Sequence, residues 1–198
     1  MPNWCNNVVE ISHGSEKMMD RVVKAFNEGS FLNEFIPVPE DLNITAGCVG
    51  DADEQKALEA KEQENLKKHG YKNWYDFCVN EWGTKWDVEP YEPITLSENG
   101  SATLAFDSAW APPVNAYEKL EALGFSVRAY YYESGMGFAG IYEDGIDDYY
   151  ELQGNADEIE NTIPEALDEM FCITENIRQW EEENQEIDLD GGLSSINE

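Results

Sequence analysis

The chain has 198 residues and a formal net charge of -30, from 42 Asp and Glu residues against 12 Lys and Arg. Of these acids, 20 follow Arg128, where Arg178 is the only Lys or Arg. Such a field repels nucleic acid and anionic membranes, and it attracts basic surfaces at a rate that falls with salt. The charge therefore argues against direct binding of nucleic acid or a membrane, and it predicts a basic partner.

The remaining composition is that of a folded protein with reduced thiols. A hydrophobic content of 41%, with 12% aromatic residues, is enough for a core. The four cysteines are widely spaced, form no CxxC pair and have only two histidines beside them, which argues against a zinc site. The start MPNWCNN has no basic region followed by an apolar run, and no stretch approaches the roughly 18 apolar residues of a membrane span. We therefore expect a cytoplasmic protein.

The first half of the chain predicts one strand, two helices and a connection. Trp4 to Ile11 is rich in β-branched residues and indicates a strand, and Ser15 opens an amphipathic helix that stops at Gly29. Phe31 to Leu42 contains two prolines, so we expect an extended connection there. Glu54 to His69 has few large apolar residues and predicts an exposed helix.

An aromatic segment follows, and then a strand and a helix. Asn73 is placed to cap a short helix whose apolar face leads to Trp82. Ser101 to Trp110 alternates apolar and polar residues and predicts a half-buried strand. Pro112 and Pro113 suit the start of a helix. We expect Trp82 and Trp110 to be largely buried.

The last part predicts a hairpin and acidic helices. Phe125 to Glu133 and Met136 to Glu143 are apolar runs separated by Ser134-Gly135, and Asp147 to Leu152 suggests a further strand. Ala156 to Phe171, interrupted at Pro164, and Glu175 to Gln185 indicate helices. Residues 187–198 are expected to be a mobile tail.

This order of elements predicts an α+β fold: a ferredoxin-like antiparallel sheet with helices on one face. We expect the ferredoxin-like domain to span residues 1–145, with a helical insertion at about 43–90. An acidic helical appendage would occupy residues 146–186.

Four motifs resemble a known family. They are MPNWCNN at the start, NEWGTKWD at 80–87, FDSAWAPP at 106–113 and YYYESGMGFAG at 130–140. Together they resemble the phage- and plasmid-borne YubB-like family, whose C-terminal part is a ferredoxin-like domain of unknown function. The resemblance covers roughly residues 1–145, implies that fold and a mobile-element setting, and carries over no catalytic residue. The acidic extension after Tyr142 is unmatched.

No catalytic, metal or cofactor site is indicated, so we expect that the protein is not an enzyme. Ser12 and Ser15 flank His13, but there is no GxSxG elbow and no phosphate-cradling GxxxxGK[ST] loop. The acids Asp144, Asp147 and Asp148, and the pair Asp188 and Asp190, do not match the spacing of a calcium loop. The aromatic strand that contains Tyr130, Tyr131 and Tyr132 is typical of strands that stack bases, because side chains alternate between its faces. The net charge opposes the approach of nucleic acid.

The main site hypothesis is nucleic-acid mimicry by the appendage, directed at a basic host protein that binds nucleic acid or serves in defence. Confined to a third of the surface, the C-terminal charges are spaced at about one per 165 Å², against roughly one per 100 Å² on a duplex. The side chains expected to replace phosphates are Glu158, Glu165, Asp168, Glu169, Glu181, Glu182 and Glu183. The alternative is that these acids only keep the protein soluble.

The second site hypothesis is an aromatic pocket for a small molecule or peptide. It would consist of Trp82, Lys85, Trp86 and Asp87, where two indoles surround a cation and a carboxylate. In the competing interpretation, which we favour, both indoles clamp the sheet and Lys85 pairs with Asp87 at its rim.

Overall fold

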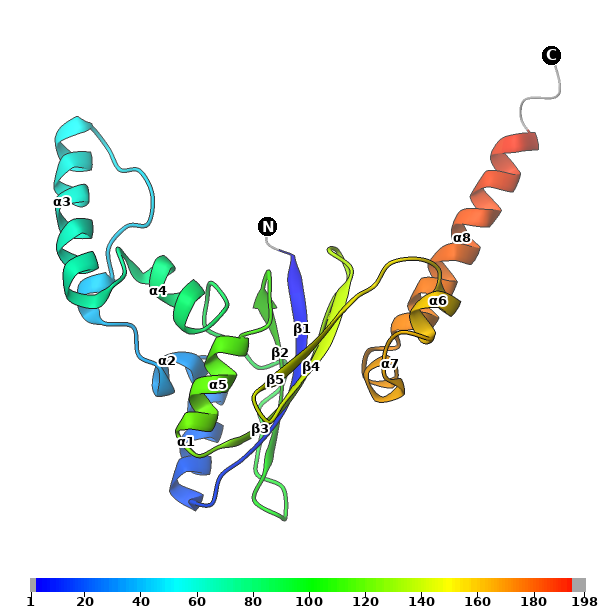
Figure 1. The fold of residues 1–198 in the computed structure, drawn as a ribbon, viewed down its shortest axis with the longest axis horizontal. Coiled ribbons are helices and arrows are strands. Elements are labelled where there is room, and N and C mark those ends of the chain that lie inside the picture. Colours follow the sequence, from blue (N-terminus) through cyan, green and yellow to red (C-terminus); the bar gives the residue numbers. More distant parts are fainter. Residues whose placement is uncertain (1–2, 194–198) are drawn as a thin grey trace.

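The protein, described here over residues 3–193 from a computed structural model, is built on one antiparallel sheet (Figure 1). The strand order is β2-β1-β3-β4-β5. The strands are β1 (Trp4–Ser12), β2 (Ala102–Ala109), β3 (Ser126–Glu133), β4 (Phe138–Glu143) and β5 (Ile146–Glu151). Every neighbouring pair is antiparallel, as predicted.

Eight α-helices and a 3-10 helix accompany the sheet over these residues. They are α1 (Glu16–Asn27), α2 (Phe31–Phe35), the 3-10 helix η1 (Glu40–Leu42), α3 (Ala52–His69), α4 (Trp74–Glu81), α5 (Val114–Ala122), α6 (Ala156–Glu160), α7 (Glu165–Phe171) and α8 (Ile173–Leu193). The expected extended connection at Phe31 to Leu42 was wrong at both ends, which form α2 and η1; only residues 36–39 connect them. Pro37 and Pro39 come after α2 and so do not interrupt it.

The α+β ferredoxin-like arrangement is present, with an irregular second strand. Residues 88–94 run antiparallel beside β2, where the Tyr91 N–H donates to the Ala105 carbonyl at 3.2 Å and Pro90 bridges Phe106. A tight turn, in which the Ser97 N–H donates to the Ser101 carbonyl, then leads into β2. The segment thus occupies the position of the second strand of a β-α-β-β-α-β unit. Pro90 and Pro93 lack N–H donors, so a regular ladder does not form.

The main core lies between one face of the sheet and the helices of the body. Val9 and Ile11 of β1 point into this core, where they pack with buried side chains of α1 and α5 and with the indole of Trp82. The Trp82 indole N–H donates to the Ile36 carbonyl at 3.0 Å, which satisfies its polar group. Burial of Trp82, predicted from the sequence, is confirmed, since its exposed fraction is 3%.

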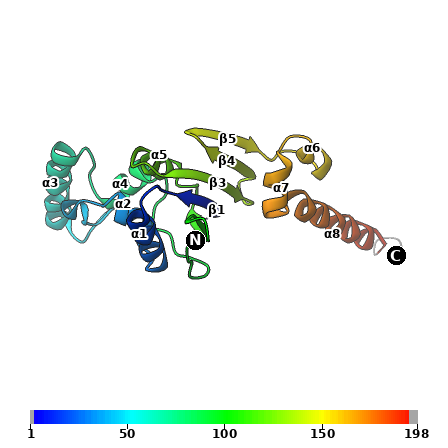
Figure 2. The ribbon, with the colours of Figure 1, turned by 90° about the horizontal axis from the view of Figure 1, so that it is seen from below.

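The appendage helices α6 to α8 pack on the opposite face of the sheet, whereas residues 146–151, expected in the appendage, form β5. On that face Tyr130 of β3 and Ala139 of β4 are buried against Leu167 of α7 and Ile173 of α8. The appendage is therefore joined to the body by its own small core, on the side away from α1 and α5 (Figure 2). Helix α8 continues through residues 187–193 of the predicted tail, and residues 194–198 lie outside the described part.

The predicted burial of Trp110 was wrong. Its side chain is 54% exposed, while Pro112 and Pro113 are buried and cover the core edge instead. Strand β2 ends at Ala109, and Trp110 turns the chain with a φ of 73°, a left-handed conformation that bulky residues rarely adopt. Ser108 anchors the turn by donating to the Ala111 carbonyl at 2.8 Å.

Candidate functional site: an acid–aromatic pocket

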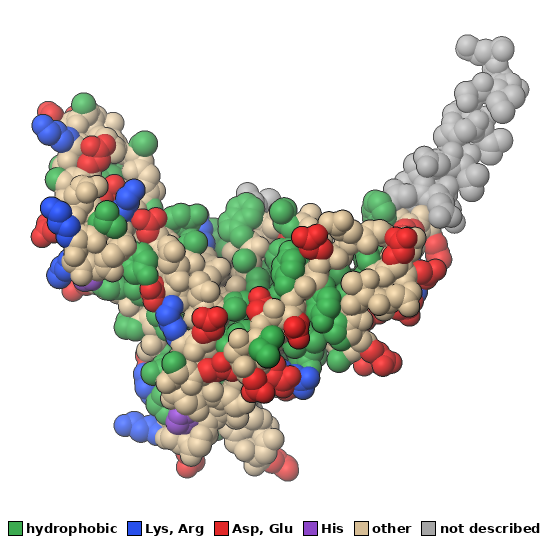
Figure 3. All heavy atoms as spheres, viewed as in Figure 1, with side chains coloured by type: hydrophobic (Ala, Val, Ile, Leu, Met, Phe, Trp, Pro, Cys, Tyr) green, Lys and Arg blue, Asp and Glu red, His purple; other side chains and the backbone are tan. Residues whose placement is uncertain are grey.

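The motifs that carry the family resemblance meet at one end of the sheet. Trp4 begins β1, Ala109 ends β2 beside it, and Glu133 ends β3 at the same side. The Trp110 N–H donates to the Asn3 carbonyl at 3.0 Å. Figure 3 shows hydrophobic side chains gathered along this edge, between the arm formed by α3 and the appendage.

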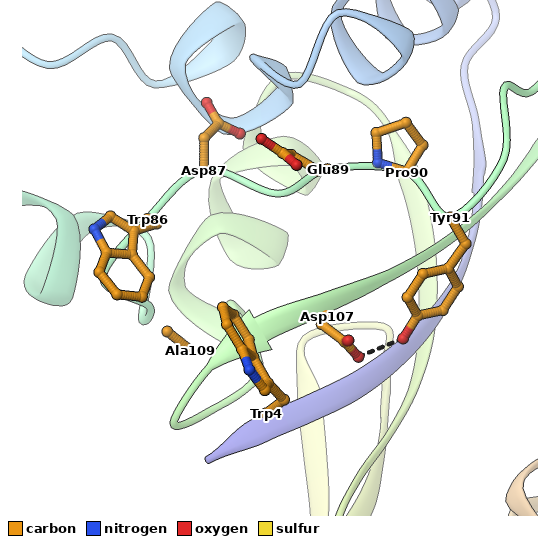
Figure 4. Close-up of a pocket in the computed structure, with 8 residues that line it drawn as sticks. All are labelled: Trp4, Trp86, Asp87, Glu89, Pro90, Tyr91, Asp107 and Ala109. Atoms are coloured by element: carbon orange, nitrogen blue, oxygen red, sulfur yellow. Dashed lines mark hydrogen bonds between the residues drawn. The ribbon is translucent and has the colours of Figure 1, made fainter. Parts of the chain in front are cut away.

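A cavity of about 430 Å³ opens at this end, within the range of roughly 300 to 1,000 Å³ typical of ligand sites. Its lining residues are Trp4, Trp86, Asp87, Glu89, Pro90, Tyr91, Asp107 and Ala109, which we call the acid–aromatic pocket (Figure 4). Three of these described side chains are carboxylates, three are aromatic, and none is Lys, Arg or His. The pocket is therefore suited to a cation rather than to an anion.

The aromatic wall is formed by two tryptophans. Trp4 is on the face of β1 away from the main core, and Trp86 follows the loop after α4. Their ring centroids are 6.2 Å apart with an interplanar angle of 36°. Trp4 is 48% exposed and Trp86 is 40% exposed, although apolar rings of this size are normally buried. Together they present an accessible π surface.

The Asp107 carboxylate is held in place by two neutral donors. Asn6, its register partner on β1, donates from Nδ2 to Oδ1 at 2.7 Å, and the Tyr91 hydroxyl donates to the same oxygen. Burial, and then the hydrogen bond to Asp107, raises the pKa of Tyr91 to about 12. The phenol therefore remains a donor at neutral pH. Among the side chains that the structure describes, no Lys, Arg or His pairs with Asp107, and the two neutral donors fix its orientation.

Asp87 has a structural role instead. Its two oxygens accept the backbone N–H groups of Leu32, Asn33 and Val88 at 2.8 to 2.9 Å, and two of these donors lie in the first turn of α2. Burial raises the pKa of Asp87, and these three donors oppose the shift. Because both oxygens are occupied, Glu89 and Asp107 are the carboxylates of this pocket available to a ligand.

The four residues of the predicted Trp82 to Asp87 pocket do not line one pocket. Trp86 and Asp87 line the acid–aromatic pocket, whereas Trp82 lies in the main core. The Lys85 Nζ lies 4.3 Å from the Trp86 ring centroid and 5.7 Å from that of Tyr75, so the expected Lys85–Asp87 pair does not form. Lys85 instead lines a neighbouring cavity with Trp110. Sequence reasoning missed Trp4, Tyr91 and Asp107, whose proximity depends on strand register.

The carboxylates expected to mimic phosphates fall into two groups. Three of them accept backbone N–H groups: Glu158 from Asn155 at 3.1 Å, Asp168 from Thr174 at 2.8 Å and Glu181 from Ala156 at 3.2 Å. These three stabilise the helix starts of the appendage. The remaining four, which are exposed, are Glu165, Glu169, Glu182 and Glu183.

Two other features of the appendage bear on its surface. Arg178 pairs with Asp157 and Glu160 and so reduces the local negative charge. Tyr132, on the face of β3 that would stack bases, lies against Phe171 of α7 with ring centroids 5.9 Å apart. Tyr130 beside it is buried. The appendage thus covers the aromatic strand.

Metal clusters and membrane spans were also sought in the described part of the chain. Among the described side chains, those of residues 3–183, no group of three or more His, Cys, Asp or Glu is placed to hold a metal ion. Asp147 accepts a hydrogen bond from the Tyr131 hydroxyl at 2.7 Å, while the side chains of Asp188 and Asp190 lie outside the described part. No helix over the described residues is long and apolar enough to cross a membrane.

Comparisons with known proteins return one solved structure. No family model and no curated protein matches the chain. The solved structure is that of the protein api92 from Yersinia pseudotuberculosis, assigned to the family DUF1281. It is 13% identical, with a TM-score of 0.40, and the match covers 78% of this chain and 99% of that chain. The resemblance to the YubB-like family stays a prediction.

Proposed function

We propose that this chain is a binding protein for a basic partner protein, and that the acid–aromatic pocket receives a cationic side chain of that partner. The observation that carries the proposal is the composition of the pocket, in which aromatic rings and carboxylates meet without a neighbouring cation in the lining. A cation over an indole face gains about 0.5 to 2 kcal/mol, and more as water is excluded.

The net charge supports the same partner. At -30, the chain attracts basic proteins from a distance and accelerates their encounter, while the pocket supplies short-range contacts. The exposed carboxylates Glu165, Glu169, Glu182 and Glu183 of the appendage add to this attraction. In the phage or plasmid setting that the family resemblance implies, the partner is a host protein that binds nucleic acid or serves in defence, and the acidic surface competes with nucleic acid for it.

Binding of a short basic peptide tests this proposal. The probe is an acetylated, amidated peptide of alternating Gly and Arg, and its affinity is measured by isothermal titration at fixed ionic strength. Trp4→Ala and Asp107→Asn should each weaken binding by about 3- to 30-fold, the loss of one cation–π or charge contact. Asp107→Asn keeps the size of the side chain but removes its charge.

Trp110→Ala is the matched control, because Trp110 is as exposed as Trp4 but lines the neighbouring cavity. It should leave the affinity within about twofold of the wild-type value. Equal losses in all three variants would indicate a general effect of the aromatic edge. Unchanged affinity in Trp4→Ala and Asp107→Asn would refute the pocket as the site.

A further inference from the structure

We infer that the acid–aromatic pocket is selective for the guanidinium group of arginine over the ammonium group of lysine. This inference rests on the proposed function and specifies its ligand. It follows from three properties of the pocket: a carboxylate of fixed orientation, a flat aromatic surface beside it, and a second carboxylate on the facing wall.

The first property concerns directional hydrogen bonding. Asn6 and Tyr91 both donate to Oδ1 of Asp107, so the carboxylate plane is fixed by contacts from β1 and from residues 88–94. Oδ2 of Asp107 accepts no hydrogen bond from residues 3–183, whose side chains the structure describes. Guanidinium carries a rigid fork of N–H donors that matches such a fixed acceptor, whereas ammonium is a compact point charge that gains little from the orientation.

The second property is the flat surface beside the acceptor. In Figure 4 the Trp4 ring lies between Trp86 and Asp107 and borders the cavity. A planar guanidinium stacks on an indole face while its edge still points at a carboxylate in the same site. Trp4 and Asp107 come from strand positions two residues apart in register, Trp4 opposite Ala109 and Asn6 opposite Asp107, so ring and acceptor are held together by the sheet itself.

The third property is a second carboxylate across the cavity. Figure 4 places Glu89, on residues 88–94, on the wall facing Trp4 and Asp107. Its side chain makes no hydrogen bond or ion pair among the side chains that the structure describes, which end at residue 183. Two acceptors on different walls can share the five N–H donors of one guanidinium, and an ammonium with three donors is matched less completely.

Lys85 provides an internal comparison for the ammonium group. Its Nζ already lies 4.3 Å from the Trp86 ring centroid, yet the side chain lines the neighbouring cavity rather than the acid–aromatic pocket. The Lys85 ammonium group thus contacts the rings of Trp86 and Tyr75 and does not pair with Glu89 or Asp107. The two pocket carboxylates remain for a ligand that needs directed acceptors.

Three peptides that differ only in the basic side chain test the inference. They are acetylated, amidated Gly-X repeats in which X is Arg, Lys or citrulline, since citrulline keeps the planar head group and lacks the charge. We expect the Arg peptide to bind at least about fivefold more tightly than the Lys peptide, and the citrulline peptide more weakly than either. Tyr91→Phe, which removes one of the two donors that orient the Asp107 carboxylate, should weaken binding of the Arg peptide more than binding of the Lys peptide and so reduce the Arg-to-Lys ratio.

The outcomes separate this inference from the proposed function. If Arg and Lys peptides bind equally and both are weakened by Trp4→Ala, the pocket binds cations but the guanidinium selectivity is refuted. If neither peptide responds to Trp4→Ala or Asp107→Asn, the proposed function itself fails. Arg selectivity that persists in Tyr91→Phe and Asp107→Asn would also refute the inference, because it would then arise elsewhere. Thermal unfolding of each variant confirms that the protein is folded.

Discussion

The acid–aromatic pocket and the C-terminal appendage are both rich in acids, but their carboxylates have different partners. In the appendage, Glu158, Asp168 and Glu181 accept backbone N–H groups at helix starts, and Arg178 pairs with two further acids. In the pocket, Asp107 is oriented by neutral donors and faces a cavity. The density of acids in the sequence therefore does not locate a binding site, whereas the groups that donate to each acid do.

The largest expected effect separates the core tryptophan from the pocket tryptophan. Trp82→Ala should lower the free energy of unfolding by about 3 to 5 kcal/mol, because it removes a fully buried ring. Trp86→Ala, its matched control, should change it by about 0.5 kcal/mol or less, since that ring is exposed. Urea unfolding followed by circular dichroism measures both. A Trp82→Ala variant that is as stable as the wild type but no longer binds the Arg peptide would show that Trp82 belongs to the binding site.

A second prediction uses the tyrosines, all of which precede the appendage helices in the sequence. A hydrogen bond to Glu81 raises the pKa of Tyr71 to about 12, burial raises that of Tyr91 to about 12, and burial also raises the pKa of Tyr117 and Tyr131. Raised values mean that the folded state binds protons more tightly than the unfolded state. Their contribution to stability is complete below about pH 10 and is lost as the pH rises through 12.

Tyrosinate absorbance and circular dichroism, recorded together against pH, measure this effect. We expect most phenols to ionise above pH 10 and to do so together with the loss of the sheet. Independent ionisation near pH 10 with the fold intact would contradict the buried positions of Tyr117 and Tyr131.

Two adjacent acids of the appendage provide a smaller test. Asp168→Ala removes the acceptor for the N–H and the hydroxyl of Thr174. It should lower the free energy of local unfolding of α7 and α8 by about 1 to 2 kcal/mol. Glu169→Ala, at an exposed position, should stay within about 0.5 kcal/mol of the wild type. Hydrogen exchange of the α7 and α8 amides reports the difference. Equal protection in both variants would mean that Asp168 is only a surface charge.

The smallest expected effect concerns the exposed acids of the appendage. Changing Glu165, Glu169, Glu182 and Glu183 together to Lys should slow association with the Arg peptide several-fold and leave dissociation nearly unchanged, because distant charge acts on the encounter. Stopped-flow kinetics at two salt concentrations measure this. A faster dissociation would place these acids in direct contact with the partner and favour the mimicry hypothesis.

Much of the fold could be predicted from the sequence because its signals are local. The alternation in 101–110 predicts β2, the Ser134-Gly135 turn predicts the β3–β4 hairpin, and Pro164 marks the boundary between α6 and α7. The role of residues 88–94 was not predicted, since a segment with two prolines lacks the pattern of a strand. Its position depends on the neighbouring strand instead.

The pocket could not be predicted from the sequence for a related reason. Trp4, Tyr91 and Asp107 belong to three distant segments that only the register of β1 and β2 brings together. Burial of Trp110 was predicted wrongly, because the prolines next to it suggested that its ring covers an edge of the core. The backbone turns at Trp110 itself, so its neighbours are buried and its ring is not.

The two edges of the sheet have a consequence for self-association. Exposed strand edges are templates for pairing with other chains, and proteins commonly block them with proline or charge. Residues 88–94 block the β2 edge with two prolines, whereas β5 at the other edge exposes Ile146 and Tyr149, with Asp147 and Asp148 between them. Near the isoelectric point of about 4.1 the net charge of the chain approaches zero and no longer opposes association, so β5 is the strand from which aggregation in acid would begin. The acidity of this chain thus also keeps its copies apart.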